Sequence, residues 1–539
     1  MPRPAPDHET TGWPPGVPFI IGNEGCERFS FYGMRSILYV YIAALFAEAH
    51  VARHEDLATG VFHEFVAAVY LLPMIGAIVS DRLLGKYRTI LWLSIVYCLG
   101  HLVLSLTEGS ITGLYWGLGL IAVGAGGIKP CVSAHVGDQF GRKNWFRLRT
   151  VFQAFYWIIN FGSFFATMLI PITKEILGTA IAFAIPGVLM AMATVVFWMG
   201  RNRFVHVPAR PGGRLGLLDT ASSVLLFASF GHLFFTADWP VWAVAATSAG
   251  CLTGGFALFV LRQRIAPDDG FLAVFLWTIW RALSGGRGDA EPTYRDAAEA
   301  PGPDHPLTKS GFWGPAVRRF GLDAAQGPVA VLKIISVFFL VSVFWALFDQ
   351  HSSSWIRQAG TMDRHIFGIE LLPSQIGAMN PLMVMILIPL LNVTLYPLCE
   401  KLGFPLTPLR RMTGGMALAA LSFAAVAILQ ARIDAAGEGE VSIAGQILPY
   451  VLITVAEVMV SITGLEFAYS QAPRRMKSTI MSFWLLTVTL GNVLVALLAR
   501  FGDLDLESFF WVFAALMAGA ALLFGVRAFF YKLQDYPQE

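Results

Sequence analysis

Charge is scarce in this sequence. Only 14% of its 539 residues are Asp, Glu, Lys or Arg, and the formal net charge is +2. This composition gives no basis for a nucleic-acid partner, which would need a strongly basic surface. Cysteine is equally sparse, and its five copies show no CxxC pair and no metal-ligand spacing. We therefore expect neither a disulfide framework, nor a metal site, nor a bound cofactor, and we interpret the cysteines as small core residues.

Apolar residues are correspondingly abundant. The chain is 56% hydrophobic, contains 42 Phe and has a mean hydropathy of +0.61. These values lie outside the ordinary soluble range and predict an all-α polytopic membrane protein in contact with lipid.

Apolar runs of about 20 residues mark candidate membrane spans. We predict fourteen transmembrane helices, grouped as six, two and six. They lie near residues 18–47, 61–80, 88–106, 111–135, 152–173, 179–200, 215–236, 239–261, 328–350, 376–398, 411–431, 446–470, 478–500 and 507–530.

These groups divide the chain into successive regions. An N-terminal tail (1–17) precedes a six-helix bundle (18–200), an inserted transmembrane pair (201–264), a linker with an amphipathic helix (265–326), a second six-helix bundle (327–531) and a C-terminal tail (532–539). The inserted pair carries few ionisable groups, so we expect a lipid-facing hairpin beside the core.

The distribution of Lys and Arg predicts the orientation. Basic connections, such as the one with Arg142, Lys143 and Arg147, alternate along the chain with acidic ones, such as the one with Asp503 and Asp505. Basic connections stay on the cytoplasmic side. Both tails and the linker are therefore expected in the cytoplasm, with the helices in the cell (inner) membrane.

The first span carries four ionisable groups. At about 100° per residue, Glu24, Arg28 and Arg35 fall on one helix face, with Glu27 close beside them. A charge at the bilayer centre costs at least about 2.5 kcal/mol, so this face must meet protein or a water-filled cavity. A buried ion pair that only joins helices is the alternative.

Two six-helix bundles joined by a cytoplasmic segment resemble the major facilitator superfamily, whose substrates bind between halves that rock alternately. The loop from Gly76 to Arg88 resembles that superfamily's loop signature. The resemblance implies a gating and structural role for Asp81 and Arg82 at the cytoplasmic end.

The segment Glu24 to Gly33 narrows the resemblance. It is similar to the ExxERFxYYG signature of the proton-dependent oligopeptide transporters (POT/PTR), except that Phe31 replaces the first tyrosine. Segments around Lys129, Asn160 and Asp349 resemble the same family, as does the one containing Glu457 and Ser461. Several of these motifs, and the position of His63, are closest to the animal branch.

The chemistry of a proton-coupled carrier can be argued from the residues. It needs groups whose proton affinity changes when a partner moves away. The candidates for proton coupling are Glu24, Glu27, Arg28, His63, Asp349 and Glu457. We expect Arg35 to pair with Asp349 when the extracellular side is closed, and a proton relayed from His63 to weaken that pair. Lys333 is either a gate at the cytoplasmic end or a snorkelling anchor.

A di- or tripeptide is a zwitterion, so its site needs a cationic and an anionic pole. Lys129 and Arg35 are candidates for the carboxylate, and Glu457 is the candidate for the ammonium. The family resemblance adds Tyr32, Tyr70, Tyr156, Asn160, Trp345, Asn380, Ser461 and Trp484 as residues lining the site.

The resemblance implies proton-coupled symport of di- and tripeptides into the cell, with H+ as the coupling ion. The alternative is a carrier of another small solute on the same fold, such as nitrate, an amino acid or a peptide-like metabolite. A sensor that binds peptide without moving it is a further alternative. A membrane enzyme would need a recognisable catalytic constellation, and the sequence contains none.

Overall fold

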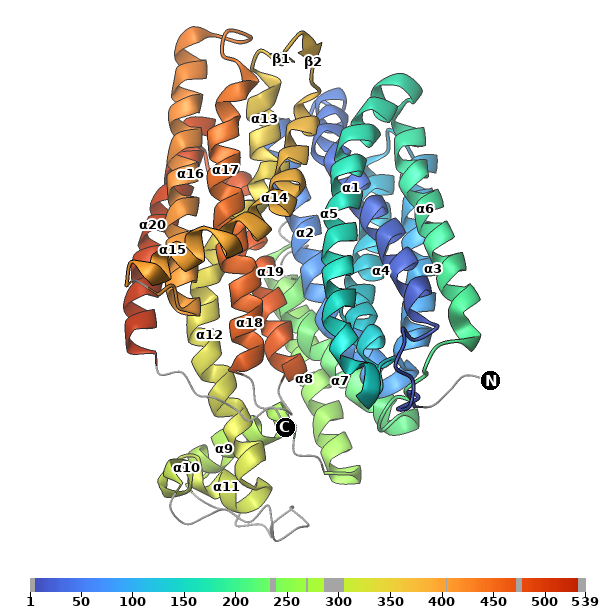
Figure 1. Cartoon of the computed structure of the whole chain (residues 1–539). Coiled ribbons are helices and arrows are strands. Elements are labelled where there is room, and N and C mark those ends of the chain that lie inside the picture. The colour runs from blue at the N-terminus through green and yellow to red at the C-terminus, as the bar shows by residue number, and fades with distance from the viewer. Residues whose placement is uncertain are drawn as a thin grey trace.

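The computed structural model describes residues 5–232, 239–267, 270–285, 305–403, 405–471 and 477–531, so the tail 532–539 lies outside the described residues. Nearly every described element is a helix (Figure 1). The first part of the chain forms α1 (Val17–Glu48), α2 (His54–Val79), the π-helical turn η1 (Ser80–Leu84), α3 (Lys86–Leu106), α4 (Ile111–Gly137), η2 (Arg142–Arg147), α5 (Leu148–Leu177), α6 (Thr179–Met199), η3 (Gly200–Asn202), α7 (Gly213–Gly231) and α8 (Val241–Ile265).

The second part begins with the short helices α9 (Phe271–Leu283), α10 (Pro306–Lys309) and α11 (Gly314–Phe320). It continues with α12 (Leu322–Phe348), η6 (Asp349–Ser352), α13 (Ser354–Gly360), η7 (Pro373–Ala378), α14 (Met379–Val393), α15 (Leu395–Lys401), α16 (Pro408–Ala436), η8 (Ile443–Gln446), α17 (Ile447–Glu457), the π-helical turn η9 (Val458–Ile462), α18 (Thr463–Ser470), α19 (Lys477–Phe501) and α20 (Leu506–Phe530). The strands β1 (His365–Ile366) and β2 (Ile369–Glu370) form a small antiparallel hairpin.

The prediction of an all-α polytopic membrane protein is confirmed. Thirteen helices in the described part of the chain are long and apolar enough to cross a membrane. The sequence predicts fourteen; the difference is α7, a 19-residue helix outside that set that packs along α8.

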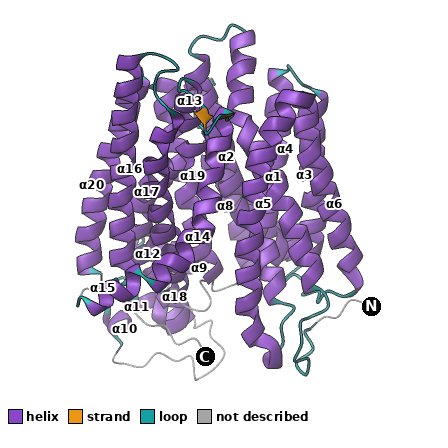
Figure 2. Cartoon of the chain, turned by 45° about the horizontal axis from the view of Figure 1, so that its top comes forward, coloured by secondary structure: helices purple, strands orange, loops and turns teal. Residues whose placement is uncertain are grey.

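The apolar residues form two large cores. One core joins α1–α6 and is built around residues such as Phe62, Tyr97 and Phe183. The other joins α12–α20 and includes Phe423 and Phe513. The bundles stand side by side in both views, and α2 packs against α19 across the junction (Figures 1 and 2).

Two ends of the molecule are useful for orientation. The terminal end holds the start of α1, the end of α20 and the helices α9–α11, whereas the hairpin end holds β1 and β2 (Figure 1). These names are independent of any membrane sidedness.

Glycine residues allow two close contacts between helices, and these contacts fix where two polar segments lie. A Cβ on Gly76 of α2 would lie 2.5 Å from the Cα of Gly127 on α4, two residues before Lys129. A Cβ on Gly491 of α19 would lie 2.7 Å from the backbone nitrogen of Ala346 on α12. Small residues allow membrane helices to approach this closely, and the second contact brings α19 against the segment that ends in Asp349.

The inserted pair packs on the first bundle at the terminal end. Helix α7 contacts α2 and η1. The carboxylate of Asp219 lies 2.7 Å from Arg262 Nε on α8 and 3.6 Å from Arg82 Nη1 on η1. The backbone N–H of Gly212 also donates to the carbonyl of Arg82 at 3.1 Å. The pair is thus attached to the loop that contains Asp81 and Arg82.

Candidate functional site

A cavity of about 210 Å³ lies between the two bundles. It is large enough to hold several waters, because each water in the liquid takes up about 30 Å³. Its lining includes Tyr32, Arg35, Ser36, Tyr70, Asn160, Ser163 and Thr167 from the first bundle, and Trp345, Phe348, Asp349, His351, Ser352, Ile356, Ser374, Gly377, Asn380, Pro381, Glu457 and Ser461 from the second. Nine residues predicted for substrate binding or proton coupling therefore share one cavity.

Arg35 and Asp349 form an ion pair across the bundles. Arg35 Nη2 on α1 donates to Asp349 Oδ1, at the end of α12, over 2.6 Å, and both side chains are buried. Their opposite charges reduce the cost of burial only while the pair stays together. Movement of the bundles apart at this point must therefore be accompanied by a change in charge or by new partners.

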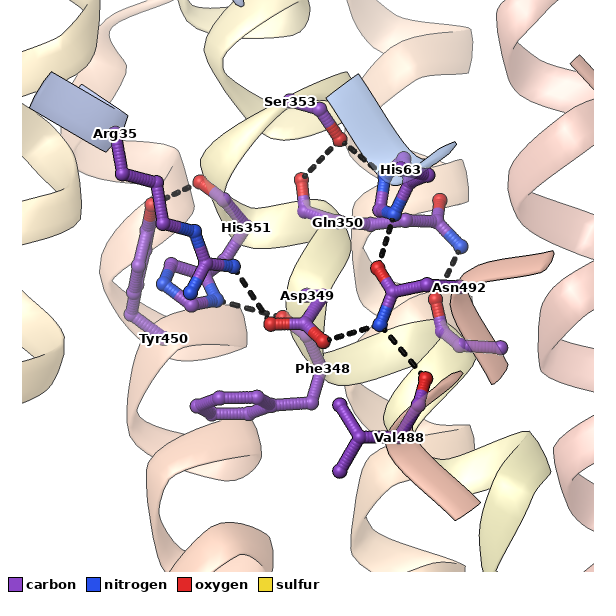
Figure 3. A network of polar contacts seen from close by, with 11 residues as sticks. Arg35, His63, Phe348, Asp349, Gln350, His351, Ser353, Tyr450, Val488 and Asn492 are labelled. Atoms are coloured by element: carbon purple, nitrogen blue, oxygen red, sulfur yellow. Dashed lines mark hydrogen bonds and ion pairs between the residues drawn. The ribbon is translucent and has the colours of Figure 1, made fainter. Parts of the chain in front are cut away.

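His63 reaches this pair through an amide that the sequence analysis missed (Figure 3). The Nδ1 atom of His63 lies 2.6 Å from Asn492 Oδ1, and Asn492 Nδ2 donates to Asp349 Oδ2 at 2.7 Å. The Nε2 atom of His63 lies 2.7 Å from Ser353 Oγ. His63 and Asp349 thus belong to one network, with Asn492 between them.

Glu457 lies on the second bundle's side of the cavity. Asn380 Nδ2 donates to Glu457 Oε2 at 2.8 Å and contacts Thr454 Oγ1 at 3.2 Å. Glu457 ends α17, and the π-helical turn η9 that follows carries Ser461 to the cavity. Such turns are frequent at functional sites, because they re-aim side chains within a helix.

Lys129 does not line the cavity. Its buried Nζ has no hydrogen-bond partner among the described residues and lies 4.1 Å from the ring centre of Tyr70 and 4.5 Å from that of Phe31. Cation–π contact with these rings stabilises the ammonium. Because the Tyr70 ring does line the cavity, Lys129 lies behind the cavity wall.

The charged face predicted on α1 is present. Arg28 Nε lies 2.7 Å from Glu24 and 3.1 Å from Glu27. Apart from this ion pair, neither buried oxygen of Glu27 accepts a hydrogen bond from the part of the chain that the structure describes. This cluster lies nearer the terminal end than Arg35 and does not line the cavity.

Two predicted aromatic residues also lie off the cavity lining. Tyr156 is partly exposed on α5, and its carbonyl accepts a 2.9 Å bond from the side chain of Asn160, which does line the cavity. Trp484 is buried behind Trp345, with ring centres 6.2 Å apart.

The remaining residues predicted to gate lie at or toward the terminal end. Arg82 contacts Asp219, as described above, and the carbonyl of Asp81 accepts from the N–H of Arg210 at 2.9 Å. Lys333 is exposed on α12, sixteen residues before Asp349.

Further ion pairs join the bundles at the hairpin end. Arg357 on α13 contacts Glu55 at 2.7 Å and Asp56 at 2.8 Å, both on α2. Arg500 on α19 lies 3.0 Å from Glu64 on α2. We call these the rim ion pairs. These contacts were not predicted, because charge and periodicity do not show which residues of distant segments meet.

Comparison with known proteins identifies the family. Residues 87–232 and 327–511 match PTR2, the POT family. The chain belongs to the POT family. The Drosophila melanogaster "Peptide transporter family 1" is 32% identical over 79% of this chain and 48% of its own length. Human "Solute carrier family 15 member 2" is 30% identical over 86% of this chain and 55% of its own length.

The fold agrees with this assignment. The crystal structure of the POT family transporter PepTSo is 37% identical, with a TM-score of 0.77, covering 98% of this chain and 100% of that chain. The predicted family resemblance and the major facilitator fold are thereby confirmed, as is the expectation that this POT protein is not an enzyme. It spans about half the length of the curated relatives that it matches.

Proposed function

We propose that this POT protein carries out proton-coupled symport of di- and tripeptides into the cell by alternating access. The observation that carries the proposal is the cavity between the bundles, which Arg35, Asp349 and Glu457 line together. A zwitterion that bridges opposite charges on the two bundles would draw them together. The printed name of the Drosophila relative, "Peptide transporter family 1", and its 32% identity to this chain support a peptide as the substrate.

In this proposal the peptide ammonium binds Glu457 and the carboxylate binds Arg35, with Lys129 supporting the same pole. Asn160 and Asn380 are within the cavity lining and supply hydrogen bonds. The aromatic side chains of Tyr32, Tyr70 and Trp345 line the cavity and tolerate varied peptide side chains, whereas Tyr156 and Trp484 lie off the lining and support this wall.

Protonation of Asp349 couples the ion to the substrate. A neutral carboxyl group holds Arg35 less strongly, so the proton both loosens the junction between bundles and releases the guanidinium for a peptide carboxylate. The Glu24, Glu27 and Arg28 cluster then serves proton release toward the terminal end, which we propose to be cytoplasmic.

The two ends act as opposite gates in a cell-membrane protein. The hairpin end, with its rim ion pairs, is the extracellular end in this proposal, and the loop with Asp81 and Arg82 belongs to the cytoplasmic gate. For Lys333 both roles stay open, either a gate residue at the cytoplasmic end or a snorkelling anchor. The inserted pair moves with the first bundle, because it is attached to that loop.

Uptake into liposomes tests the function. We expect labelled dialanine to accumulate when a proton gradient points inward, and Asp349→Asn to lose accumulation while keeping peptide counterflow. Asp363→Asn is the matched control, because it neutralises an exposed carboxylate outside the cavity. Absence of peptide movement in every mode refutes the proposal, and selective movement of another small solute supports the alternative carrier.

A further inference from the structure

The amide of Asn492 occupies a position that nothing in the POT assignment explains. It lies fully buried on α19 between two ionisable side chains that belong to different bundles, His63 on α2 and Asp349 after α12. Its contacts determine its orientation. Nδ2 lies 2.7 Å from a carboxylate oxygen of Asp349 and 2.9 Å from the carbonyl oxygen of Val488, and both are acceptors.

The two amide hydrogens of Asn492 are therefore both used, and its oxygen must face His63. The opposite orientation would place the oxygen against two other acceptors. Because Oδ1 only accepts, Nδ1 of His63 carries a hydrogen. In a neutral imidazole, Nε2 is then the acceptor, and the hydroxyl of Ser353 donates to it at 2.7 Å.

Protonation of His63 changes only one side of this arrangement. Nε2 then becomes a donor, and the hydroxyl of Ser353 must turn to another acceptor; the carbonyl of Gln350 lies 3.5 Å away. The bond from Nδ1 to Asn492 stays the same in both protonation states. Protonation thus changes the hydrogen bond between His63 and Ser353, in the turn that follows Asp349. The hydrogen bond between His63 and Asn492 on α19 keeps the same donor and acceptor (Figure 3).

The same amide separates His63 from Asp349. Both of its hydrogens are amide hydrogens, which do not dissociate at physiological pH, so the amide cannot receive a proton from His63 and pass one to the carboxylate. Arg35, Asp349 and His351 are the charged or titratable groups that act electrostatically on His63. A relay through Asn492 is therefore closed in this conformation, and no proton passes between His63 and Asp349 through this amide.

We propose that Asn492 is a positioning residue for proton coupling, which holds His63 in its Nδ1–H form and Asp349 in contact with Arg35 while keeping their protons separate. This inference rests on the proposed symport function. It makes two different substitutions informative. Asn492→Leu keeps the approximate size and removes both contacts, whereas Asn492→Asp keeps an acceptor for His63 and adds a negative charge beside Asp349.

The test measures proton-driven uptake and counterflow of dialanine in liposomes from pH 5 to pH 8. We expect Asn492→Asp to move the midpoint of the pH profile upward by about one unit, because the added carboxylate favours protonation of both neighbours. Asn492→Leu should lower proton-driven uptake at least tenfold more than it lowers counterflow. Thr489→Val is the matched control, because Thr489 lies one turn away on α19 and its hydroxyl contacts the Ala67 carbonyl, not His63 or Asp349.

Other outcomes overturn the inference. The inference is wrong if both Asn492 variants keep the wild-type midpoint and the wild-type ratio of uptake to counterflow. It is also wrong if Thr489→Val shifts these quantities as much as the Asn492 variants do. A readout independent of transport is ¹⁵N NMR of labelled histidine, with His63→Gln identifying the His63 signal. Loss of the Nδ1–H signature in folded Asn492→Leu supports the inference even if wild-type protein moves no peptide, and its retention contradicts it.

Discussion

The rim ion pair between Arg500 and Glu64 offers a direct test of how the bundles are held at the hairpin end. The two side chains are 18% and 12% exposed, and Nη1 lies 3.0 Å from Oε1. At an effective dielectric constant near 20, their Coulomb attraction is about 5–6 kcal/mol. The costs of desolvation and of side-chain entropy offset much of this attraction. The net contribution of the pair to the closed state is then about 1–3 kcal/mol, between the values typical of exposed and of buried ion pairs.

If this contact exists only when the hairpin end is closed, its loss shifts the equilibrium toward opening. A change of about 1–3 kcal/mol corresponds to about a 5- to 150-fold change in the ratio of open to closed molecules. We expect this shift in both Glu64→Gln and Arg500→Gln, and the double variant should add little to either. Exchange of the charges, Glu64→Arg with Arg500→Glu, should restore part of the closed population.

Distance measurements between fluorophores report the opening. Labels at Glu108, in the α3–α4 connection, and at Glu438, in the α16–α17 connection, place one reporter on each bundle after removal of the five native cysteines. Glu175→Gln is the control, because Glu175 pairs with Lys174 within one bundle. Additive effects of the single substitutions, or unchanged distance distributions, would refute the reasoning.

Three further outcomes are expected. Glu457→Gln should weaken dialanine binding by about 10- to 150-fold in calorimetry, as expected from loss of a charge-assisted contact of about 1.5–3 kcal/mol; unchanged affinity would remove Glu457 from the site. Asp219→Asn should lower the melting temperature of the purified protein, because it weakens the contacts with Arg262 and Arg82; a wild-type melting temperature would contradict this. Asp505 is the N-cap of α20, and hydrogen bonds from Ser508 lower the pKa of its carboxyl group. The cap therefore stabilises the fold at pH values above the ordinary pKa of Asp, and this stabilisation is lost as the pH falls through the lowered pKa of the folded state. Asp505→Ala should therefore cost about 1 kcal/mol at pH 7 and progressively less toward pH 3 in thermal unfolding, and a difference independent of pH would exclude the cap.

The helices could be predicted from the sequence because lipid imposes a simple length and polarity rule. The amphipathic helix expected in the linker is observed as α9 (Phe271–Leu283). The pairing of Arg35 with Asp349 could also be predicted, because each charge lies in an apolar helix that cannot leave it alone. These predictions depend on local composition and on the cost of burying charge.

Contacts between distant segments were harder to predict. Asn492 carries a signal, since it is a polar amide in the apolar helix α19, but nothing in the sequence places it between His63 and Asp349. Lys129 was predicted at the cavity, whereas the rings of Phe31 and Tyr70 enclose its ammonium behind the wall. Both outcomes depend on rotamers and helix register, which periodicity does not determine.

The placement of the cations predicts an unequal contribution of the two peptide termini. In this conformation Arg35 is paired with Asp349, and Lys129 is off the cavity lining, whereas Glu457 lines the cavity beside Asn380. The group that binds the peptide ammonium, Glu457, is thus available, whereas Arg35, which binds the peptide carboxylate, is still held by Asp349.

N-acetylation of dialanine should therefore weaken binding at neutral pH more than C-terminal amidation does. Loss of one charge-assisted contact, about 1.5–3 kcal/mol, predicts a difference of about 10- to 150-fold in Kd. Asp349→Asn releases Arg35 from its ion pair, so amidation should become as costly as acetylation in that variant. Calorimetric titration of the three peptides into both proteins measures the differences. If amidation already costs as much as acetylation in the wild type, Arg35 binds carboxylate without leaving Asp349, and the proposed competition between substrate and Asp349 is wrong.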